Sequence, residues 1–313
     1  MVAPASPFDP AALEAGLAVL RGPLGLRPRF RPDLSARAGY LAGDDGRRLE
    51  EWREAVADRE ARAIFCARGG YGAMRLLPAI DPAPLLREPK LLVGFSDLTA
   101  LHALLNRAGL ATVHGPVVTQ LGRAPDDAVA HLKALLYGEA PRPSAWGAPE
   151  AGAGLAGGAT VTPGRARGRL LGGSLALLGH LCGTPWMPLL EGAILILEDV
   201  GERPYRLDRY LTQLALAGVA VGQLTDCDGE AGAEVVRRLV GALGVPAAEG
   251  FPFGHEDRNL ALPLGPQATL VAPGPGEEGP ARLLFDEGAT APAPPAGGLS
   301  EPAAGQSGPA GEA

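Results

Sequence analysis

Short, continuously apolar runs alternate in the first half of the chain with longer stretches whose apolar residues recur every three or four positions. The apolar runs predict strands, at residues 2–6, 63–66, 91–93 and 112–114. The periodic stretches predict helices, at residues 9–20, 44–61, 73–77, 96–106 and 126–137. Strands that are apolar on both faces are typical of a parallel sheet covered by helices on each side. The pattern therefore predicts an α/β fold, in which ligands bind at the carboxyl ends of the parallel strands.

The second half of the chain repeats this alternation after a change in composition. Residues 139–166 are rich in Pro, Gly and Ala without periodicity, so they predict a linker between two domains. Beyond it we expect strands at 193–197, 219–224, 260–262, 268–271 and 281–285, and helices at 204–216 and 231–243. Residues 286–313 are mostly small residues, Pro and Glu, which predicts a disordered tail. The expected domains are 1–138 and 167–285.

Composition narrows the class of partner. A formal net charge of -7 argues against binding to nucleic acid and to an anionic membrane surface. The sequence has no transmembrane stretch, and its first residues do not resemble a signal peptide, so we expect a cytoplasmic protein. The three cysteines, Cys66, Cys182 and Cys227, are too few and too scattered for a zinc site or a disulfide framework. No metal and no cofactor are expected.

One turn, Gly94-Phe95-Ser96-Asp97, joins the apolar run at 91–93 to the helix at 96–106. A serine there lies at a helix N-terminus, beside backbone N–H groups that have no partner within the helix. Such groups stabilise the negative charge that develops on a carbonyl oxygen during acyl transfer, so Ser96 is a candidate nucleophile. The alternative is that Ser96 only caps the helix, a common role for serine at this position.

A serine nucleophile needs a base, and the base needs a third group that orients it. Of the five histidines, His255 is the candidate base because it lies in an irregular loop, residues 250–257, whose glycines and proline fix the backbone. His114 follows a strand and could line the same cleft, although a packing role in its loop is the simpler interpretation. The other three lie in predicted helices and are interpreted as structural or poorly placed: His102, His131 and His180.

Glu198 is the candidate for the orienting acid. It follows the apolar run at 193–197, where a carboxylate loses most of its water and needs partners. We expect the backbone N–H groups of residues 198–203 to supply them. The alternative is an ion pair between Glu198 and Arg203 or Arg206 in the following loop.

Five short motifs occur in order along residues 1–285. They are Ala67-Arg68-Gly69-Gly70-Tyr71-Gly72, Gly94-Phe95-Ser96-Asp97, Leu197-Glu198-Asp199-Val200-Gly201-Glu202, Pro204-Tyr205-Arg206 and Gly254-His255. Together they resemble the LD-carboxypeptidase family of serine peptidases, which includes the murein tetrapeptide carboxypeptidases and their microcin-immunity relatives. The resemblance implies a flavodoxin-like N-terminal domain with the serine, a C-terminal α/β domain with the acid and the histidine, and an active site between them. It also implies a homodimer.

The resemblance assigns roles to individual residues. It makes Ser96 the nucleophile, His255 the general base and Glu198 the group that orients the histidine. The backbone N–H groups of Gly70 and Asp97 are the expected oxyanion hole. Substrate contacts are expected from the glycine loop, at Arg68, Gly69 and Tyr71. By charge alone, Arg203 and Arg206 are further candidates, beside Arg68, for binding a substrate carboxylate.

The implied reaction is hydrolysis of the amide between an L-centre and a terminal D-amino acid. In this family it releases D-alanine from muropeptide tetrapeptides during cell-wall recycling. One alternative is an immunity-type peptidase that cleaves a peptidyl-nucleotide antibiotic, and another is a ligand-binding α/β module without turnover.

Two features depart from the family pattern. Ser174 stands where the family often has asparagine, and the segment between Ala18 and Asp44 is shortened. The serine turn also differs from an α/β-hydrolase elbow, because Leu98 replaces the second glycine of that motif.

Overall fold

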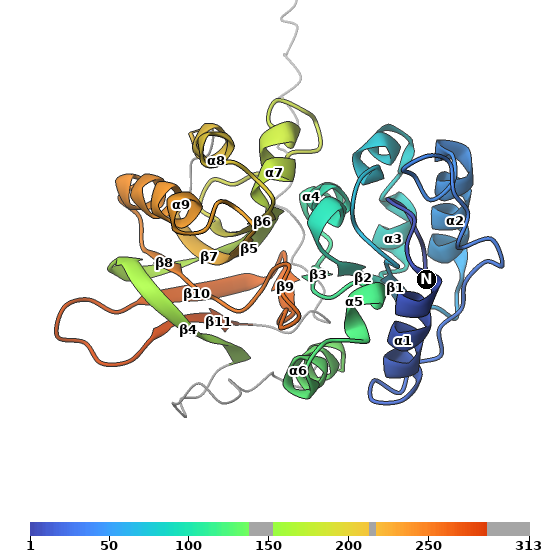
Figure 1. Cartoon of the computed structure of the whole chain (residues 1–313), viewed down its shortest axis with the longest axis horizontal. Coiled ribbons are helices and arrows are strands. Elements are labelled where there is room, and N and C mark those ends of the chain that lie inside the picture. The colour runs from blue at the N-terminus through green and yellow to red at the C-terminus, as the bar shows by residue number, and fades with distance from the viewer. Residues whose placement is uncertain (138–152, 213–216, 287–313) are drawn as a thin grey trace, which may run out of the picture.

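The computed structural model describes residues 1–137, 153–212 and 217–286 (Figure 1). Two lobes lie side by side, one formed mainly by the first half of the chain and the other by the second half. Residues 287–313 of the predicted tail at 286–313, and residues 139–152 of the predicted linker at 139–166, lie outside the described residues. No helix in the described ranges is long and apolar enough to cross a membrane.

The N-terminal lobe is built on a four-stranded sheet in the order β1-β2-β3-β9. Strands β1 (Ala63–Phe65), β2 (Leu91–Gly94) and β3 (Thr112–His114) are parallel, as predicted, and β9 (Leu262–Leu264) pairs antiparallel with β3. The expected strand at 2–6 is reduced to one parallel bridge between Val2 and Cys66. The parallel strands follow chain order, whereas a flavodoxin-like sheet has the order 2-1-3. The α/β class is therefore confirmed, but the flavodoxin-like strand order is not found.

Helices cover both faces of this sheet. Neighbouring strand residues point to opposite sides, and since both are apolar, each face must be buried. Ile64 and Leu92 join one apolar cluster, and Phe65 and Val93 join another. The α-helices of the lobe are α1 (Pro10–Arg21), α2 (Asp45–Ala57), α3 (Ala83–Arg87), α4 (Thr99–Arg107), α5 (Val118–Leu121) and α6 (Asp126–Leu136). Two 3₁₀ segments, η1 (Ala73–Ala79) and η2 (Ser96–Leu98), follow the glycine loop and the serine turn.

The C-terminal lobe contains a closed barrel in the order β10-β11-β4-β8-β7-β6-β5. Its strands are β4 (Ala153–Thr162), β5 (Gly164–Ser174), β6 (Ile194–Val200), β7 (Gly218–Thr225), β8 (Ala247–Glu249), β10 (Gln267–Ala272) and β11 (Ala281–Phe285). Strands β5, β6, β7 and β8 are parallel, while the pairs that involve β4, β10 and β11 with their neighbours are antiparallel. Helices α7 (Leu175–Leu181), α8 (Pro204–Leu211) and α9 (Glu230–Ala242) pack outside it.

The prediction of an irregular linker is wrong for residues 153–166, which form β4 and the start of β5. Glycines that suggested flexibility are instead sites of close packing between barrel strands. A Cβ added to Gly154 would lie 2.3 Å from the carbonyl oxygen of Leu283 on β11, and one added to Gly158 would lie 2.9 Å from that of Glu249 on β8. Only glycine leaves room for these backbones to approach.

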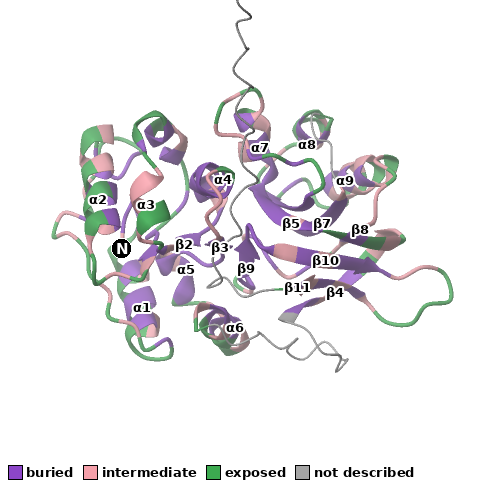
Figure 2. Cartoon of the chain, turned by 180° about the vertical axis from the view of Figure 1, so that it is seen from behind, coloured by how far each residue is buried: buried purple, intermediate pink, exposed green. Residues whose placement is uncertain are grey.

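Strand β9 joins the two lobes. Its residues belong to the second half of the chain, yet it completes the N-terminal sheet beside β3. Helix α4 adds to this junction, since the Asn106 side chain donates to the Leu264 carbonyl and Arg169 on β5 donates to the Asn106 carbonyl. Figure 2 shows that β9 and the neighbouring part of the barrel are buried. The lobes are therefore joined by buried contacts along β3, β9 and α4.

Because α1 packs closely on α5, we expect Gly→Ala substitutions at two helical glycines to change the free energy of unfolding in opposite directions. A Cβ added to Gly16 would lie 1.9 Å from the Val118 carbonyl oxygen, whereas one at Gly46, on the exposed side of α2, meets only Asp44 Oδ1 at 3.4 Å. Gly→Ala in a helix ordinarily stabilises by up to about 1 kcal/mol. We expect G46A to follow that rule and G16A to lower the free energy of unfolding by about 1–3 kcal/mol through overpacking.

Chemical denaturation of the two variants measures both effects. A G16A protein as stable as G46A would contradict the close contact between α1 and α5.

Candidate active site

The three predicted catalytic side chains come from distant parts of the chain and form one line of contacts. Ser96 Oγ lies 3.0 Å from His255 Nε2, and His255 Nδ1 lies 2.7 Å from Glu198 Oε2. The serine lies at the end of β2 in the N-terminal lobe, and the other two belong to the C-terminal half of the chain. A hydroxyl, an imidazole and a carboxylate in this order can activate the hydroxyl as a nucleophile.

Ser96 has a backbone φ of 65°, in the left-handed region that residues other than glycine seldom adopt. Such local strain is typical of functional sites, where the surrounding structure imposes it. The cap interpretation of Ser96 is wrong, because Phe95 occupies the N-cap position of η2 and the Ser96 hydroxyl contacts His255 instead. The strained turn points the hydroxyl toward the base.

Glu198 is fully buried on β6, and its partners are not those expected from the sequence. Arg203 pairs with Asp228 and Arg206 with Glu202, so neither neutralises the acid. No backbone N–H within the described residues donates to the carboxylate either. Two histidines face it instead. Oε2 contacts His255, and Oε1 lies 3.7 Å from Nε2 of His114.

The two histidines decide the charge of Glu198. Burial raises the pKa of the carboxyl, but the contacts with His114 and His255 outweigh burial and lower the pKa to about 2. At His255 the contact again outweighs burial, but the shift has the other direction. Burial lowers the pKa of the imidazole, the contact with Glu198 raises it by more, and the pKa is therefore raised. The acid is therefore ionised at neutral pH, and it stabilises an imidazolium at His255.

The ring of His255 is oriented by its surroundings. Its Nδ1 faces the carboxylate, which leaves Nε2 to accept a proton from Ser96. The Nδ1–H bond does not point along the short line to Oε2, a geometry common in sites without substrate. The Phe95 ring packs edge-on against the imidazole at a centroid distance of 4.8 Å.

The loop that carries His255 is held by amide side chains that sequence reasoning missed. Gln120 donates to the Glu256 carbonyl at 2.8 Å, and Gln223 accepts from the Glu256 N–H at 2.9 Å. Asn259, itself fully buried, accepts from the Gly254 N–H and donates to Gln120. The sequence signal that could have identified these residues is an amide side chain within an otherwise apolar segment. The three amide side chains hold the loop on both sides of His255.

The glycine loop lies directly against the serine. A Cβ added to Gly69 would lie 3.0 Å from Ser96 Cβ and 3.3 Å from its Oγ, so glycine is required there. Gly70 has a φ of 104°, and a Cβ on it would lie 2.5 Å from Ser6 Oγ. The N–H groups of Gly70 and Asp97 donate to no other group in the described part of the chain. Both remain available to a ligand near Ser96.

Two buried charged residues hold this loop in place. The carboxylate of Asp97 accepts from the Ala73 N–H at 2.8 Å, which ties the serine turn to the segment after the loop. Burial raises the pKa of Asp97. Arg48, which is fully buried on α2, donates to the carbonyls of Pro4 and Gly72. Arg48 carried no signal in the sequence beyond its position in a charged helix.

The remaining predicted residues lie around this centre. Arg68 is exposed and donates to the Pro7 carbonyl. Tyr71 is also exposed, and its ring packs edge-on against Tyr40. Ser174, at the end of β5, caps α7 by accepting from the Leu177 N–H.

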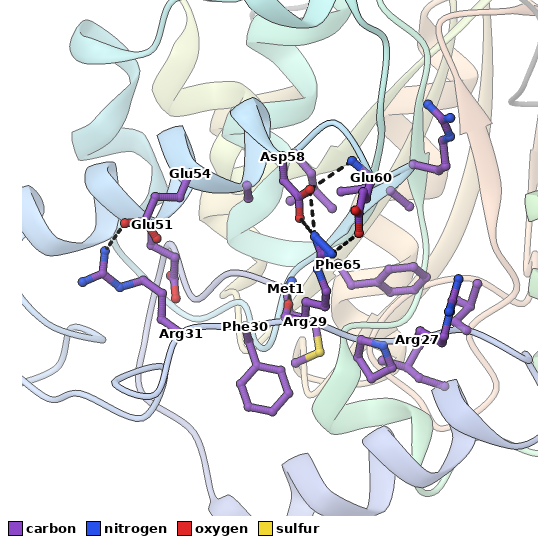
Figure 3. Close-up of a pocket in the computed structure, with 18 of the residues that line it drawn as sticks. Met1, Arg27, Arg29, Phe30, Arg31, Glu51, Glu54, Asp58, Glu60 and Phe65 are labelled. Carbon is purple, nitrogen blue, oxygen red and sulfur yellow. Dashed lines mark hydrogen bonds and ion pairs between the residues drawn. The ribbon is translucent and has the colours of Figure 1, made fainter.

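A cavity of about 630 Å³ lies elsewhere, at the amino end of β1 (Figure 3). It is lined by the segment 25–31, by the end of α2 and by Arg62 to Phe65, and none of the three catalytic candidates borders it. Arg29 there pairs with Asp58 and Glu60. Within the described ranges no group of three or more His, Cys, Asp or Glu side chains could hold a metal ion.

Comparison with known proteins assigns the chain to a family. Residues 1–115 match the LD-carboxypeptidase N-terminal domain, and residues 167–270 match the LD-carboxypeptidase C-terminal domain. A putative carboxypeptidase from Streptomyces coelicolor is 41% identical, over 87% of this chain and 89% of the relative. The murein tetrapeptide carboxypeptidase of Pseudomonas aeruginosa is 36% identical, over 86% and 92%.

Further matches agree with that assignment. The crystal structure of muramoyltetrapeptide carboxypeptidase from Oxalobacter formigenes superposes with a TM-score of 0.73 at 27% identity, covering 91% of this chain and 99% of that one. The microcin C7 self-immunity protein of Escherichia coli is less similar, at 27% identity over 74% of this chain and 77% of the relative. The chain belongs to the LD-carboxypeptidase family and is a hydrolase of the serine peptidase type.

Proposed function

We propose that this protein is a serine LD-carboxypeptidase that releases the terminal D-alanine from muropeptide tetrapeptides. The contact line from Ser96 through His255 to Glu198 carries the proposal, because it supplies the nucleophile, the base and the orienting acid of amide hydrolysis. The murein tetrapeptide carboxypeptidase relative supports the substrate class. The family context also suggests a cytoplasmic homodimer that acts in cell-wall recycling.

The reaction follows from the positions of these atoms. Ser96 Oγ attacks the carbonyl carbon of the scissile amide while its proton passes to His255 Nε2. The imidazolium, stabilised by Glu198, then donates that proton to the leaving nitrogen, and the C–N bond breaks to release the D-amino acid. Water attacks the resulting ester with His255 again as base, and the second product leaves with Ser96 restored.

The oxyanion that forms twice in this sequence needs N–H donors close to Ser96. Gly70 and Asp97 are the proposed pair, because both N–H groups lack a partner within the described residues and both belong to segments in contact with the serine. Asp97 has a second part in this arrangement, since its carboxylate joins the two segments through Ala73. The hole is thereby organised before substrate binds.

Binding of the substrate carboxylate is assigned to Arg68. Arg203 and Arg206 each pair with an acidic side chain, whereas Arg68 donates only to a backbone carbonyl, so its charge is not neutralised within the described residues. Gly69 and Tyr71 would contact the substrate from the same loop. Tyr71 is suited to a broad contact because its ring is exposed beside Tyr40.

A muropeptide tetrapeptide and its all-L counterpart, incubated with purified protein, test the substrate and its stereochemistry. We expect loss of one alanine from the D-terminated peptide only, detected by mass spectrometry. S96A is expected to lower the rate by several orders of magnitude because the nucleophile is removed. An S96A protein with a tenth of the original activity would exclude Ser96 as the nucleophile.

The cleavage assay, combined with covalent labelling, separates the two alternative functions, an immunity-type peptidase and a binding module. A protein that cleaves neither peptide but is still labelled at Ser96 by a serine-directed covalent probe would favour the immunity-type substrate. A protein that is not labelled would favour a binding module.

The pH dependence of kcat/KM tests the pairing of Glu198 with His255. The base must be neutral, so kcat/KM falls as the pH drops through the raised pKa of His255 and is retained above it. E198Q removes the negative charge that raises this pKa. We expect its acid limb to move to lower pH and its kcat to fall by about 10⁴-fold through loss of ring orientation. An acid limb that stays in place or moves upward in E198Q would contradict the pairing.

The glycine loop is tested by G69A. Its φ is ordinary, so the effect is steric: the added methyl meets Ser96 and displaces the nucleophile or the loop. A displacement near 1 Å can lower the rate by about 100-fold, which is the loss of kcat/KM we expect. G241A on α9 is the matched control, since its Cβ would meet only Val161 Cγ1 at 3.7 Å. Equal kcat/KM values for G69A and G241A would place the loop away from the reaction.

A further inference from the structure

His114 is a buried histidine that faces the catalytic acid from the other lobe. It ends β3, where it pairs in register with Gly94, and its side chain is fully buried. Its ring packs edge-on against Phe95 and Phe253. Neither of its ring nitrogens has a hydrogen-bond partner in the described part of the chain. An imidazole buried among apolar rings without a partner is costly, so its retention needs an explanation.

The explanation lies in the second oxygen of Glu198. Oε2 faces His255, and Oε1 faces Nε2 of His114 at 3.7 Å. Closure of this gap by about 0.8 Å gives an ordinary hydrogen-bond length. The carboxylate and the imidazole are each other's remaining partners, since no other donor in the described ranges reaches Oε1. Their contact accounts for both buried groups at once.

We propose that His114 is a positioning residue for the proposed peptidase reaction, donating from Nε2 to Oε1 of Glu198 so that Oε2 stays directed at His255. The contact acts through Glu198, and His114 does not touch the substrate. It also holds the carboxylate in its ionised form inside an apolar environment. The inference rests on the proposed roles of Ser96, His255 and Glu198.

The other titratable groups nearby are compatible with this role. His102 on α4 lies 6.4 Å from the His114 ring, and its Nε2 contacts the Gly94 carbonyl. Burial lowers the pKa of His102 to about 3, so it carries no charge at neutral pH.

Asp199 follows Glu198 but accepts from the N–H groups of Ala176 and Val200. Burial and the charge of Glu198 raise its pKa to about 7. Among these groups, His114 is the donor that faces Oε1.

The test compares two substitutions of similar length at one position. H114M removes the donor, and H114Q replaces it with an amide N–H that can reach the same oxygen. Loss of a hydrogen bond to a charged group changes an equilibrium or rate constant by about 10- to 100-fold. We therefore expect the kcat of H114M to fall by that factor, with little change in KM. We also expect its acid limb to move to higher pH, because a carboxylate without this donor binds the proton of the Glu198–His255 pair more strongly. H114Q should restore most of both properties.

H131M is the matched control. His131 is buried on α6 with Nε2 at 2.9 Å from the Ala261 carbonyl, so the change removes a buried histidine without touching Glu198. Its stability is expected to fall, but its acid limb should stay in place. Equal acid limbs in H114M, H114Q and wild type, or an H114Q protein as impaired as H114M, would overturn the proposal.

The rate of covalent labelling of Ser96, followed against pH in the same variants, separates this proposal from the proposed substrate. If the wild type releases no D-alanine, the proposed function fails, while the labelling profiles still decide the role of His114. The profile of H114M should shift upward and that of H114Q should not. If H114M does not fold, an H114Q labelling profile that differs from wild type would count against the proposal.

Discussion

The burial of one carboxylate sets the conditions for the rest of the site. An ionised side chain such as Glu198 is costly in an apolar interior unless its partners approach closely. The barrel strand that carries it supplies none of these partners. They come from the loop that bears His255 and, across the lobe boundary, from the last residue of a strand in the N-terminal sheet. The charge of Glu198 therefore has both of its partners only when the two lobes are in place, so the proposed chemistry requires the lobes to dock.

The secondary structure of the N-terminal half was accessible from its sequence, because buried parallel strands and amphipathic helices leave clear apolar patterns. The barrel was not. Its strands at 153–166 are built from glycines and small residues whose packing depends on partners more than a hundred positions away, such as Leu283. Local composition there indicates flexibility, and only the paired backbone shows otherwise. The same limit applies to β9, whose short apolar segment gave no sign that it completes the sheet of the other lobe.

The site divides in a similar way. Ser96, His255 and Glu198 became candidates because their residue types have known chemistry and their motifs resemble a family, and the structure brings the three into contact. The residues that hold them were missed. Arg48, Gln120 and Asn259 act through hydrogen bonds to backbone groups, and such bonds can be made by many residue types at many positions. His114 was noticed but given a packing role, since its proximity to Glu198 depends on how two lobes meet.

The position of β9 has a consequence for the order of events during synthesis. The N-terminal sheet exposes an unpaired edge at β3 until residues 262–264 have left the ribosome and joined it. By then the serine, the acid and the histidine have all been made, because His255 precedes that strand by only a few residues. A partly made chain thus carries the proposed nucleophile without its proposed base, in a lobe whose sheet is still incomplete. With these roles, hydrolytic competence arrives in one late step, together with the closure of the edge.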